Sequence, residues 1–466
     1  MAVPHVLIFP LPLQGPVNCM LKLAELLCLH QETHVTFINT EYIHQRLLNY
    51  TDVLIRFAKY PNFKFVTVPD GLPEDNPRNG DQIGKIIEGV EKVSSPLFRE
   101  MVMMTTTTCL IVDGIFTFAV DIAKEAKIPL LYFDTISPCA IWTYLAVPKL
   151  IEDGEIPFKG NDLDALVNSV SGMEGVMRRR DLPSYCRATD LDIPIIQHVI
   201  KQGKHIVQAQ ALILNTFEAL EGPILSQFRA LCPNIYAIGP LHTQLKAKLA
   251  SQSLPTSNSL WKEDMSCIDW LNKQPNKSVL FVSIGSLATM SKAQFLEFWY
   301  GLVNSKTNFL WVQRPGSIIG LEDDDINVPM ELVESTKERG CIVSWAPQEE
   351  VLAHPSIGGF LTHCGWNSTL ESIVEGVPMI CWPYFVDQQV NSRYVAEVWK
   401  LGLDMKDVCD RATIERMVIE VMDVKKIEFL ERAKQMSNLA IASVGEGGAS
   451  YQDLERLIED IRLMRI

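Results

Sequence analysis

The sequence has no long hydrophobic run. Its longest apolar stretch, at residues 377–386, is interrupted by Pro378 and Pro383, and it falls far short of the roughly 20 residues that a helix needs to cross a bilayer. The apolar run at residues 6–9 is short and lacks the charged start of a signal peptide, so it is predicted to be the first strand of the fold. We therefore expect a soluble, cytoplasmic protein with no membrane insertion.

The sequence also lacks a recognisable cysteine pattern. Its 11 cysteines are scattered between Cys19 and Cys409, and none forms a Cys-x-x-Cys pair. An odd number without regular spacing fits neither a zinc site nor a framework of disulfides. The cysteines are expected to be isolated reduced thiols, as in a cytosolic protein, and no metal site is predicted.

Positive charge is scarce as well. The chain has 42 Lys and Arg residues against 56 Asp and Glu residues, which gives a formal net charge of -14. Proteins that bind the phosphate backbone of nucleic acids need a basic face, so we expect no nucleic-acid partner. The 466 residues are more than one hydrophobic core usually serves, and two domains are expected.

Short apolar runs alternate with longer amphipathic stretches along the chain. This alternation predicts an α/β fold in which parallel strands are joined by crossover helices. Strands are expected at residues 6–9, 35–38, 63–66, 110–112, 130–133, 212–214 and 235–238, and again at 279–283, 309–312, 341–343, 358–361 and 378–381. Such sheets bind ligands at the carboxyl ends of their strands, so a cleft between two domains is the expected active site.

The pattern also suggests where the domains divide. We expect an N-terminal domain at residues 1–240 and a C-terminal domain at residues 260–440. Residues 241–259 are rich in Ser, Lys and Gln without a clear period, which indicates an interdomain linker. Residues 441–466 contain a final amphipathic helix that needs an apolar surface to pack against.

The most informative segment covers residues 345–388. Within it, residues 363–368 (HCGWNS) end a strand and open a helix, and Gly365 allows a ligand to approach the backbone closely. The exposed N–H groups and the dipole of such a helix start suit a diphosphate. Asn367 and Ser368 would add hydrogen bonds, or would instead cap the helix.

Two more side chains in this segment suit a nucleoside. Glu371 is placed to accept hydrogen bonds from ribose hydroxyls, unless it is simply an exposed helical residue, and Trp345 offers a flat face for a base, unless it is a core aromatic. The segment resembles, nearly residue for residue, the signature box of the plant family 1 UDP-glycosyltransferases. These enzymes have the GT-B fold, in which two Rossmann-like domains face a central cleft.

The resemblance implies a donor site for a UDP-sugar. The implied contacts are Trp345 and Ala346 with uracil, Gln348 and Glu371 with the ribose, Ser286, His363, Asn367 and Ser368 with the diphosphate, and Trp366, Asp387 and Gln388 with the sugar. A terminal Gln accompanies glucose donors in this family. Gln388 therefore favours UDP-glucose as the co-substrate, and no other cofactor is expected.

The resemblance continues, more weakly, through the N-terminal half. Residues 9–15 (FPLPLQG) and 180–183 (RDLP) are similar to those of members that glycosylate small terpenoids and phenolics. The family places a His directly after Gln-Gly as the base that deprotonates the acceptor hydroxyl. This chain has Pro16 there, which offers no side-chain proton acceptor. Asp113 matches the Asp that orients this His, or is a turn residue after a strand.

Four explanations of Pro16 stay open. Asp113 acts as the base, directly or through a water. The acceptor is a carboxylic acid that is already ionised at neutral pH. Another histidine replaces the missing one, and His5, His44 and His242 lie in suitable regions. Lastly, the chain is a weak or inactive transferase, since loss of a general base costs about 10²–10⁴-fold in rate.

The expected activity is an inverting transfer of glucose from UDP-glucose to a hydroxyl or carboxyl group of a small lipophilic plant metabolite. The metabolite is expected to be a terpenoid, such as an iridoid, or a phenolic, and the enzyme to be a monomer. The helix start near Asn367 would stabilise the departing UDP, and the family resemblance implies that the last helix packs back on the N-terminal domain. The alternative is a UDP-sugar-binding protein with weak or no catalysis because of Pro16.

Overall fold

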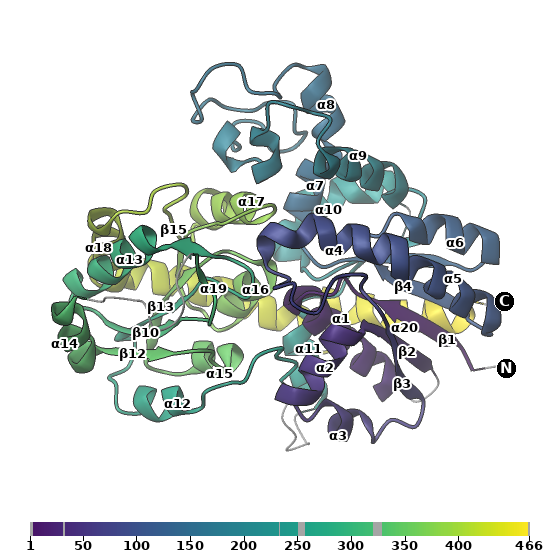
Figure 1. Ribbon diagram of the computed structural model, residues 1–466, viewed down its shortest axis with the longest axis horizontal. Helices are drawn as coiled ribbons and strands as arrows, with labels where there is room; N and C mark the ends of the chain where they lie inside the picture. Colours follow the sequence, from purple (N-terminus) through teal and green to yellow (C-terminus); the bar gives the residue numbers. More distant parts are fainter. Residues whose placement is uncertain (1–2, 31–32, 233, 250–256, 320–328, 465–466) are drawn as a thin grey trace.

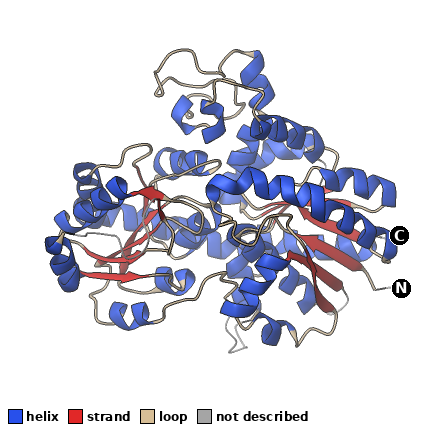
Figure 2. Ribbon diagram, in the orientation of Figure 1, coloured by secondary structure: helices blue, strands red, loops and turns tan. Residues whose placement is uncertain are grey.

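The structure is a computed structural model that describes residues 3–30, 33–232, 234–249, 257–319 and 329–464. It contains two parallel β-sheets that lie side by side (Figure 1). Figure 2 shows the strands of both sheets packed between helices. The predicted α/β fold with two Rossmann-like domains is confirmed. Across the described ranges, no helix has the length and apolar character needed to cross a membrane.

The N-terminal sheet has seven parallel strands in the order β3-β2-β1-β4-β5-β6-β7. Leu7 and Phe9 of the first strand belong to one hydrophobic core, and Val6 and Ile8 to another, because successive side chains of a strand point to opposite faces. The sheet is thus buried on both faces, as parallel sheets are. Its strands are β1 (His5–Phe9), β2 (His34–Thr40), β3 (Phe63–Val68), β4 (Cys109–Asp113), β5 (Leu130–Asp134), β6 (Ala211–Leu214) and β7 (Ile235–Ala237).

The C-terminal sheet has six parallel strands in the order β12-β10-β8-β13-β14-β15. When strands are numbered within each sheet, the first six strands of the N-terminal sheet and all six of the C-terminal sheet have the order 3-2-1-4-5-6 of the doubly wound fold. Ligands of this fold bind where the strand order reverses. A short two-stranded sheet, β9 with β11, is hydrogen-bonded separately and shares a hydrophobic core with β8. The strands are β8 (Val279–Ser283), β9 (Met290–Ser291), β10 (Asn308–Val312), β11 (Ile318–Ile319), β12 (Gly340–Val343), β13 (Ile357–Thr362), β14 (Met379–Cys381) and β15 (Gly402–Asp404).

Helices connect the strands and cover the sheets (Figure 2). Those of the N-terminal half are α1 (Gln14–Leu29), α2 (Glu41–Tyr50), α3 (Val53–Phe57), α4 (Ile83–Gly89), α5 (Ser95–Met104), α6 (Phe118–Ala126), α7 (Pro138–Leu145), α8 (Val147–Glu152), α9 (Pro194–Ile206), α10 (Glu218–Leu231) and α11 (Leu241–Lys248). Those of the C-terminal half are α12 (Ser266–Leu271), α13 (Lys292–Asn304), α14 (Met330–Arg339), α15 (Gln348–Ala353), α16 (Trp366–Val374), α17 (Gln388–Arg393), α18 (Arg411–Ile419), α19 (Lys426–Val444) and α20 (Ala449–Leu463).

The segment 241–259, in which we expected a linker without regular structure, begins with helix α11. Leu241 and Leu245 of this helix are buried in the same core as β1. Their spacing of one helical turn gives α11 the apolar stripe that packs against the N-terminal domain. Residues 250–256 of the expected linker lie outside the described residues.

The last helix, α20, runs back from the C-terminal domain onto the N-terminal sheet (Figure 1). Leu454, Leu457 and Ile461 are buried in the core that also contains residues of β1. Beside them, the hydroxyl of Tyr236 donates a hydrogen bond to Asp460 Oδ2 at 2.6 Å. The buried stripe of this amphipathic helix therefore lies against the domain at the opposite end of the chain.

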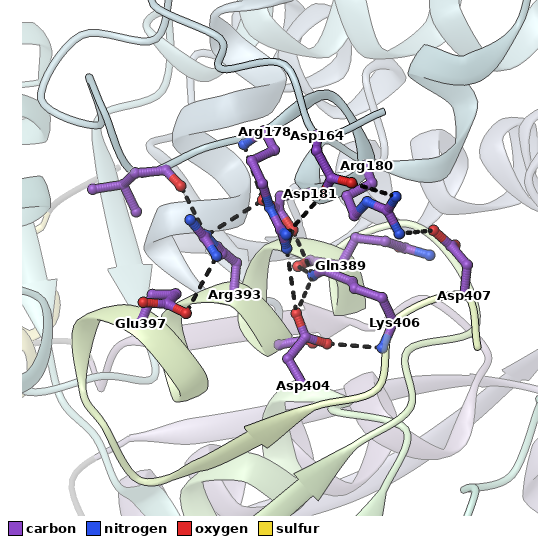
Figure 3. A network of polar contacts seen from close by, with 12 residues as sticks. Asp164, Arg178, Arg180, Asp181, Gln389, Arg393, Glu397, Asp404, Lys406 and Asp407 are labelled. Carbon is purple, nitrogen blue, oxygen red and sulfur yellow. Dashed lines mark hydrogen bonds and ion pairs between the residues drawn. The ribbon is translucent and has the colours of Figure 1, made fainter. Parts of the chain in front are cut away.

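A network of ion pairs joins the two domains (Figure 3). At its centre is Asp181, in a short 3-10 turn of the N-terminal half, whose side chain is fully buried. Its carboxylate lies 2.8 Å from Arg178 Nε, 3.0 Å from Lys406 Nζ and 3.4 Å from Arg393 Nε. Burial alone would raise the pKa of Asp181, but Lys406 and Arg178 hold it below its usual value.

Candidate active site

A cavity of about 580 Å³ lies between the two domains. The lining residues up to Gln202 form its N-terminal wall, and those from Ser257 onwards form its C-terminal wall. Both walls contain the carboxyl ends of parallel strands, which is where doubly wound sheets bind ligands. The cavity is lined by every residue that the sequence analysis placed at the donor site or the catalytic centre, namely Pro16, Asp113, Ser286, Trp345, Ala346, Gln348, His363, Trp366, Asn367, Ser368, Glu371, Asp387 and Gln388.

The start of helix α16 faces the cavity without a capping side chain. Between β13 and α16, Cys364 adopts a positive φ of 63°, and the N-cap is Gly365. No side chain in the described structure caps this helix, so the interpretation of Asn367 or Ser368 as a helix cap is wrong. The first N–H groups of α16 are therefore not occupied by a cap, which leaves them for an anion.

His363 is held between two glycines at this helix start. A Cβ at Gly285 would lie 2.4 Å from His363 Nε2, and a Cβ at Gly365 would lie 2.5 Å from it, so both glycines make room for the ring. Burial lowers the pKa of His363 to about 4, which keeps the imidazole neutral at physiological pH. Asn367 Nδ2 donates a hydrogen bond of 2.9 Å to the carbonyl of Gly15. This contact joins the starts of α16 and α1.

A polar group next to the helix start suits a ribose. Gln348 Nε2 donates to Ser368 Oγ at 2.9 Å and to Glu371 Oε2 at 2.7 Å. Glu371 is only 5% exposed, so the alternative of an exposed helical residue is wrong. Burial and the nearby Glu349 raise the pKa of Glu371 to about 7. A hydroxyl that donates to Glu371 would stabilise its ionised form.

Trp345 is half-buried and lies against a second tryptophan. Its ring centroid is 5.8 Å from that of Trp261, with 30° between the ring planes. The guanidinium of Arg46 lies over the ring of Trp261, 4.2 Å from its centroid. Trp261 itself is not among the residues that line the cavity.

The three residues expected at the sugar are oriented in different ways. The Trp366 indole is 3% exposed and donates a hydrogen bond of 2.8 Å to the carbonyl of Asn215, so its side chain packs between the domains. Asp387 Oδ2 accepts from Asn391 Nδ2 at 2.9 Å, and burial raises the pKa of Asp387 to about 7. Gln388 Oε1 accepts main-chain N–H groups of its own loop, which leaves its amide group as the donor toward the cavity.

Pro16 lies inside helix α1, which begins at Gln14. The first N–H groups of a helix have no partner within it, so a proline in the first turn costs no hydrogen bond. Pro16 lines the cavity and brings no proton acceptor to it.

Asp113 ends β4 and is 4% exposed. Its Oδ2 accepts from the N–H of Leu11 at 3.4 Å and from Thr135 Oγ1 at 3.3 Å, and its Oδ1 accepts from the N–H of Ile115 at 3.2 Å. Burial nevertheless raises the pKa of Asp113 to about 6. Asp113 therefore makes the hydrogen bonds of a turn residue and also lies at the cavity.

The three histidines considered as substitutes are not at the cavity. His5 is on β1 and bonds to Thr36 Oγ1 at 2.8 Å, His44 is on α2, and His242 is on α11, where burial lowers its pKa to about 4. None of these three is among the residues that line the cavity. The interpretation that one of them replaces the missing base is therefore wrong.

Sequence reasoning missed one buried carboxyl group on the N-terminal wall, that of Asp134. It ends β5, the neighbour of β4, and Phe133 is in register with Asp113. Asp134 is 2% exposed and lines the cavity. The sequence did contain a signal for Asp134, since two apolar strands each end in Asp. If such strands are neighbours in a parallel sheet, their carboxylates lie at the same edge.

The comparison with known proteins identifies the class to which this site belongs. The family model of UDP-glucoronosyl and UDP-glucosyl transferases matches residues 97–428, and the chain belongs to this family. It is therefore a UDP-glycosyltransferase, an enzyme that transfers a hexose from a UDP-sugar.

Particular relatives agree in sequence and in fold. The chain is 54% identical to 7-deoxyloganetic acid glucosyltransferase of Catharanthus roseus, over 99% of this chain and 98% of that protein. The crystal structure of Os79 from O. sativa in complex with UDP has a TM-score of 0.81 and 27% identity, covering 98% of this chain and 100% of the other. Medicago truncatula UGT71G1 complexed with UDP-glucose has a TM-score of 0.79 and 25% identity, covering 98% of each chain. These structures confirm the GT-B fold.

Proposed function

We propose that this enzyme transfers glucose from UDP-glucose, with inversion, to an oxygen of a small lipophilic plant metabolite. A terpenoid such as an iridoid, or a phenolic, is the proposed acceptor. The observation that carries this proposal is the division of the cavity between polar groups at the uncapped start of α16 and apolar groups of the N-terminal wall. The high identity to a relative named for 7-deoxyloganetic acid supports an iridoid acceptor.

The C-terminal wall is proposed to hold the donor. The N–H groups at the start of α16, with Ser286, the neutral His363 and the hydroxyl of Ser368, would bind the diphosphate. The Gln348–Glu371 pair would bind the ribose, and uracil would stack on Trp345 with main-chain bonds to Ala346. The sugar would meet Asp387, the amide of Gln388 and the main chain of Trp366, since the Trp366 indole is turned away.

The N-terminal wall is proposed to hold the acceptor. Its lining is mostly aliphatic and aromatic, which suits a lipophilic skeleton by burial of apolar surface. The apolar residues involved are Leu11, Leu13, Ile83, Ile87, Ile115, Ile136, Ile195 and Val199. The only charged groups on this wall, among the residues that the structure describes, are the carboxyl groups of Asp113 and Asp134.

The transfer is proposed to be a single displacement. The acceptor oxygen forms a bond to the anomeric carbon while the bond from this carbon to the diphosphate breaks, and UDP leaves with the electron pair. The start of α16 stabilises the charge that develops on UDP. The acceptor proton passes to the buried carboxyl groups of the N-terminal wall, of which Asp113 is the one that the sequence pattern indicated.

We further propose a cytoplasmic monomer that needs no metal or other cofactor and binds small molecules, not nucleic acid. The net charge of -14 supports the last point.

The test is direct. Purified enzyme is incubated with UDP-glucose and a panel of phenols, terpene alcohols and carboxylic acids that includes 7-deoxyloganetic acid, and glucosides are detected by mass. UDP-galactose is run in competition, and we expect UDP-glucose to be used better because Gln388 faces the sugar. Preference for UDP-galactose would contradict the donor assignment.

The alternative raised by Pro16, UDP-sugar binding without catalysis, is not favoured, because the chain is 54% identical over 99% of its length to a relative named as a glucosyltransferase. Such a protein would bind UDP-glucose in calorimetry and form no glucoside with any member of the panel. Formation of any glucoside at a rate well above that without protein excludes this candidate.

A further inference from the structure

One fully buried amide group, that of Asn391 in α17, joins three parts of the molecule that surround the cavity. Its Nδ2 donates a hydrogen bond of 2.9 Å to Asp387 Oδ2 and another of 2.9 Å to the carbonyl of Cys364. Its Oδ1 accepts a hydrogen bond of 2.5 Å from the hydroxyl of Ser137. Asn391 therefore contacts a carboxyl group of the donor side, the loop before α16 and the N-terminal domain.

The partners of Asn391 fix the direction of its amide group. A main-chain carbonyl only accepts hydrogen bonds, so the amide atom that meets Cys364 must be the nitrogen. Both N–H groups are used, by Cys364 and Asp387, and the oxygen is used by Ser137. Turning the amide over would bring its oxygen against the Cys364 carbonyl and leave buried groups unpaired. The network therefore holds Asn391 in one orientation.

The two carboxylate oxygens of Asp387 have different surroundings. Asn391 holds Oδ2. Oδ1 makes no hydrogen bond with any of the residues that the structure describes, and it is not among the enclosed polar atoms that lack a partner. Because Asp387 lines the cavity, the accessible oxygen of this carboxyl group is Oδ1. The bond from Asn391 thus orients Asp387 with one oxygen left for a hydroxyl of a bound sugar.

Ser137 connects this arrangement to the N-terminal wall. It is fully buried and is the N-cap of α7, where its Oγ also accepts a hydrogen bond of 3.2 Å from a main-chain N–H of that helix. The two residues before it, 135–136, line the cavity. Ser137 is therefore held at the end of the wall that faces the acceptor. Its bond to Asn391 sets the position of Asp387 relative to this wall.

We propose that Asn391 is a positioning residue for sugar transfer, which holds Asp387 in place for the glucose unit and fixes it relative to the N-terminal wall through Ser137. Asn391 is not among the residues that line the cavity, so it acts on the sugar only through Asp387. Buried residues that hold a binding side chain in one geometry determine how well that side chain works. This inference rests on the function proposed above, in which Asp387 meets the sugar.

The first experiment measures the Kd values of UDP and of UDP-glucose by titration calorimetry without acceptor. Asn391→Ala should raise the ratio of the Kd of UDP-glucose to that of UDP by about 10-fold, because only UDP-glucose carries the sugar that Asp387 meets. The ratio is used because loss of the bond to the Cys364 carbonyl affects both ligands through the diphosphate. An unchanged ratio would overturn the inference.

A double-mutant cycle separates positioning from general damage to the structure. Asp387→Ala should raise the ratio at least as much as Asn391→Ala does. When Asp387 is already Ala, adding Asn391→Ala should change the ratio by less than about 2-fold, because there is no carboxyl group left to position. Independent structural effects would multiply, so a double variant whose loss equals the product of the two single losses contradicts the inference.

The bond from Ser137 is tested in the same way. Ser137→Ala leaves Asn391 Oδ1 without its donor and should raise the ratio by about 3-fold. When Asn391 is already Ala, adding Ser137→Ala should have no further effect on the ratio. A full effect in that background would show that Ser137 acts through α7 alone, which contradicts the proposed link to the N-terminal wall.

Ser392→Ala is the matched control. Ser392 is the next residue in α17, it is also fully buried, and its hydroxyl bonds to Asp404, which does not line the cavity. This variant should leave the ratio within about 2-fold of the wild type. If it changes the ratio as much as Asn391→Ala does, the packing of α17 is responsible and the inference is wrong.

Circular dichroism shows whether each variant is folded. If Asn391→Ala does not fold, Asn391→Ser takes its place in every comparison. Its side chain keeps a hydroxyl group but is too short to bond to both Cys364 and Asp387, so the same pattern is expected with a smaller rise in the ratio. An Asn391→Ser variant with the wild-type ratio would then refute the inference.

The inference and the proposed function fail in different ways. If Asp387→Ala keeps the wild-type ratio, Asp387 does not meet the sugar, and the proposed donor site is wrong together with this inference. If Asp387→Ala raises the ratio while Asn391→Ala does not, the inference alone is wrong.

Discussion

At the scale of single residues, Pro16 leaves the first turn of α1 intact while removing a proton acceptor from the cavity. We expect Pro16→His to raise kcat with hydroxyl acceptors by about 10- to 100-fold, within the about 10²–10⁴ that a positioned base contributes. The new imidazole would lie on the same wall as Asp113, which would favour its charged form. Initial rates at pH 7 check this expectation.

Pro16→Ala is the matched control, since it removes the proline without adding a base. It should leave kcat within about 3-fold of the wild type, because the backbone nitrogen of a first-turn residue has no hydrogen-bond partner within the helix, whether the residue is Pro or Ala. An equal gain in both variants would mean that flexibility of α1, and not proton transfer, limits the rate.

Asp134 should weaken the fold at high pH. Its pKa is raised to about 8 in the folded protein, whereas an unfolded Asp titrates near pH 4. Between these values the folded state holds a proton that the unfolded state has lost, so the free energy of unfolding of the wild type falls as the pH rises from about 4 to about 8. Asp134→Asn lacks this penalty and should gain stability on the order of 1–3 kcal/mol at pH 9.

Urea denaturation at pH 5 and pH 9 measures this effect. The advantage of Asp134→Asn should be small at pH 5 and largest at pH 9. Asp192→Asn, on an exposed residue, should stay within about 0.5 kcal/mol of the wild type at both values. A pH-independent difference for Asp134→Asn would contradict the expectation.

Glu371 tests the ribose site. Glu371→Ala removes the partner of Gln348 Nε2 in a buried position, and an unsatisfied buried donor costs about 1–3 kcal/mol. We expect the Kd values of UDP and of UDP-glucose to rise together, by about 10- to 100-fold. Titration calorimetry measures both. Unchanged affinity for UDP would show that Glu371 does not hold the ribose.

At the scale of elements, α20 is the feature with the clearest energetic consequence. Leu457 is completely buried against the N-terminal core, and Leu463 on the same helix is 61% exposed. Leu457→Ala should lower the free energy of unfolding by about 2–5 kcal/mol. Leu463→Ala should change it by less than about 0.5 kcal/mol. Urea denaturation followed by tryptophan fluorescence compares the two, and equal small effects would mean that α20 does not stabilise the N-terminal domain.

The strands of the two large sheets were easier to predict than helix α11. Each predicted strand corresponds to one in the structure, because buried parallel strands are short continuous apolar runs. Strand β15 was not predicted, since its residues Gly402–Asp404 form only a brief extended piece at a sheet edge. Helix α11 was missed because its polar residues hide the two leucines, Leu241 and Leu245, that pack on the domain.

At the scale of the whole molecule, the ion-pair network around Asp181 holds the domains together (Figure 3). Asp181→Asn would leave Lys406 paired only with Asp404 and Arg393 paired only with the more exposed Glu397, and removing one partner of a buried ion pair costs up to about 3–5 kcal/mol. We expect a lower free energy of unfolding and a larger radius of gyration in small-angle X-ray scattering. The wild type should lose the same stabilisation when the pH falls below about 4, because the pKa of Asp181 is lowered in the folded state.

The exposed pair of Arg229 and Glu218, at 2.8 Å, provides the control for this prediction. Glu218→Gln should change the stability by less than about 1 kcal/mol, since solvent screens such pairs. If Asp181→Asn behaves like Glu218→Gln, the network does not hold the domains in place.

The C-terminal wall of the cavity could be predicted largely from one segment of the sequence. Residues 345–388 carry the strand end, the helix start and the polar side chains together, and the structure places those side chains at the cavity. The orientation of single side chains did not follow. Trp366 was expected at the sugar, but its indole bonds to the carbonyl of Asn215 in the other domain.

The fold class, the enzyme family and the absence of the usual base at Pro16 could be predicted from the sequence alone, because strand periodicity and a contiguous motif are local properties of the chain. What lies beside Pro16 depends on the tertiary structure. It excluded the three candidate histidines from the cavity, and it brought Asp113 and Asp134 together at the ends of neighbouring strands. Burial raises the pKa of both carboxyl groups, and the charge of Asp113 raises that of Asp134 further. Both effects arise from the packing of residues that are distant in sequence.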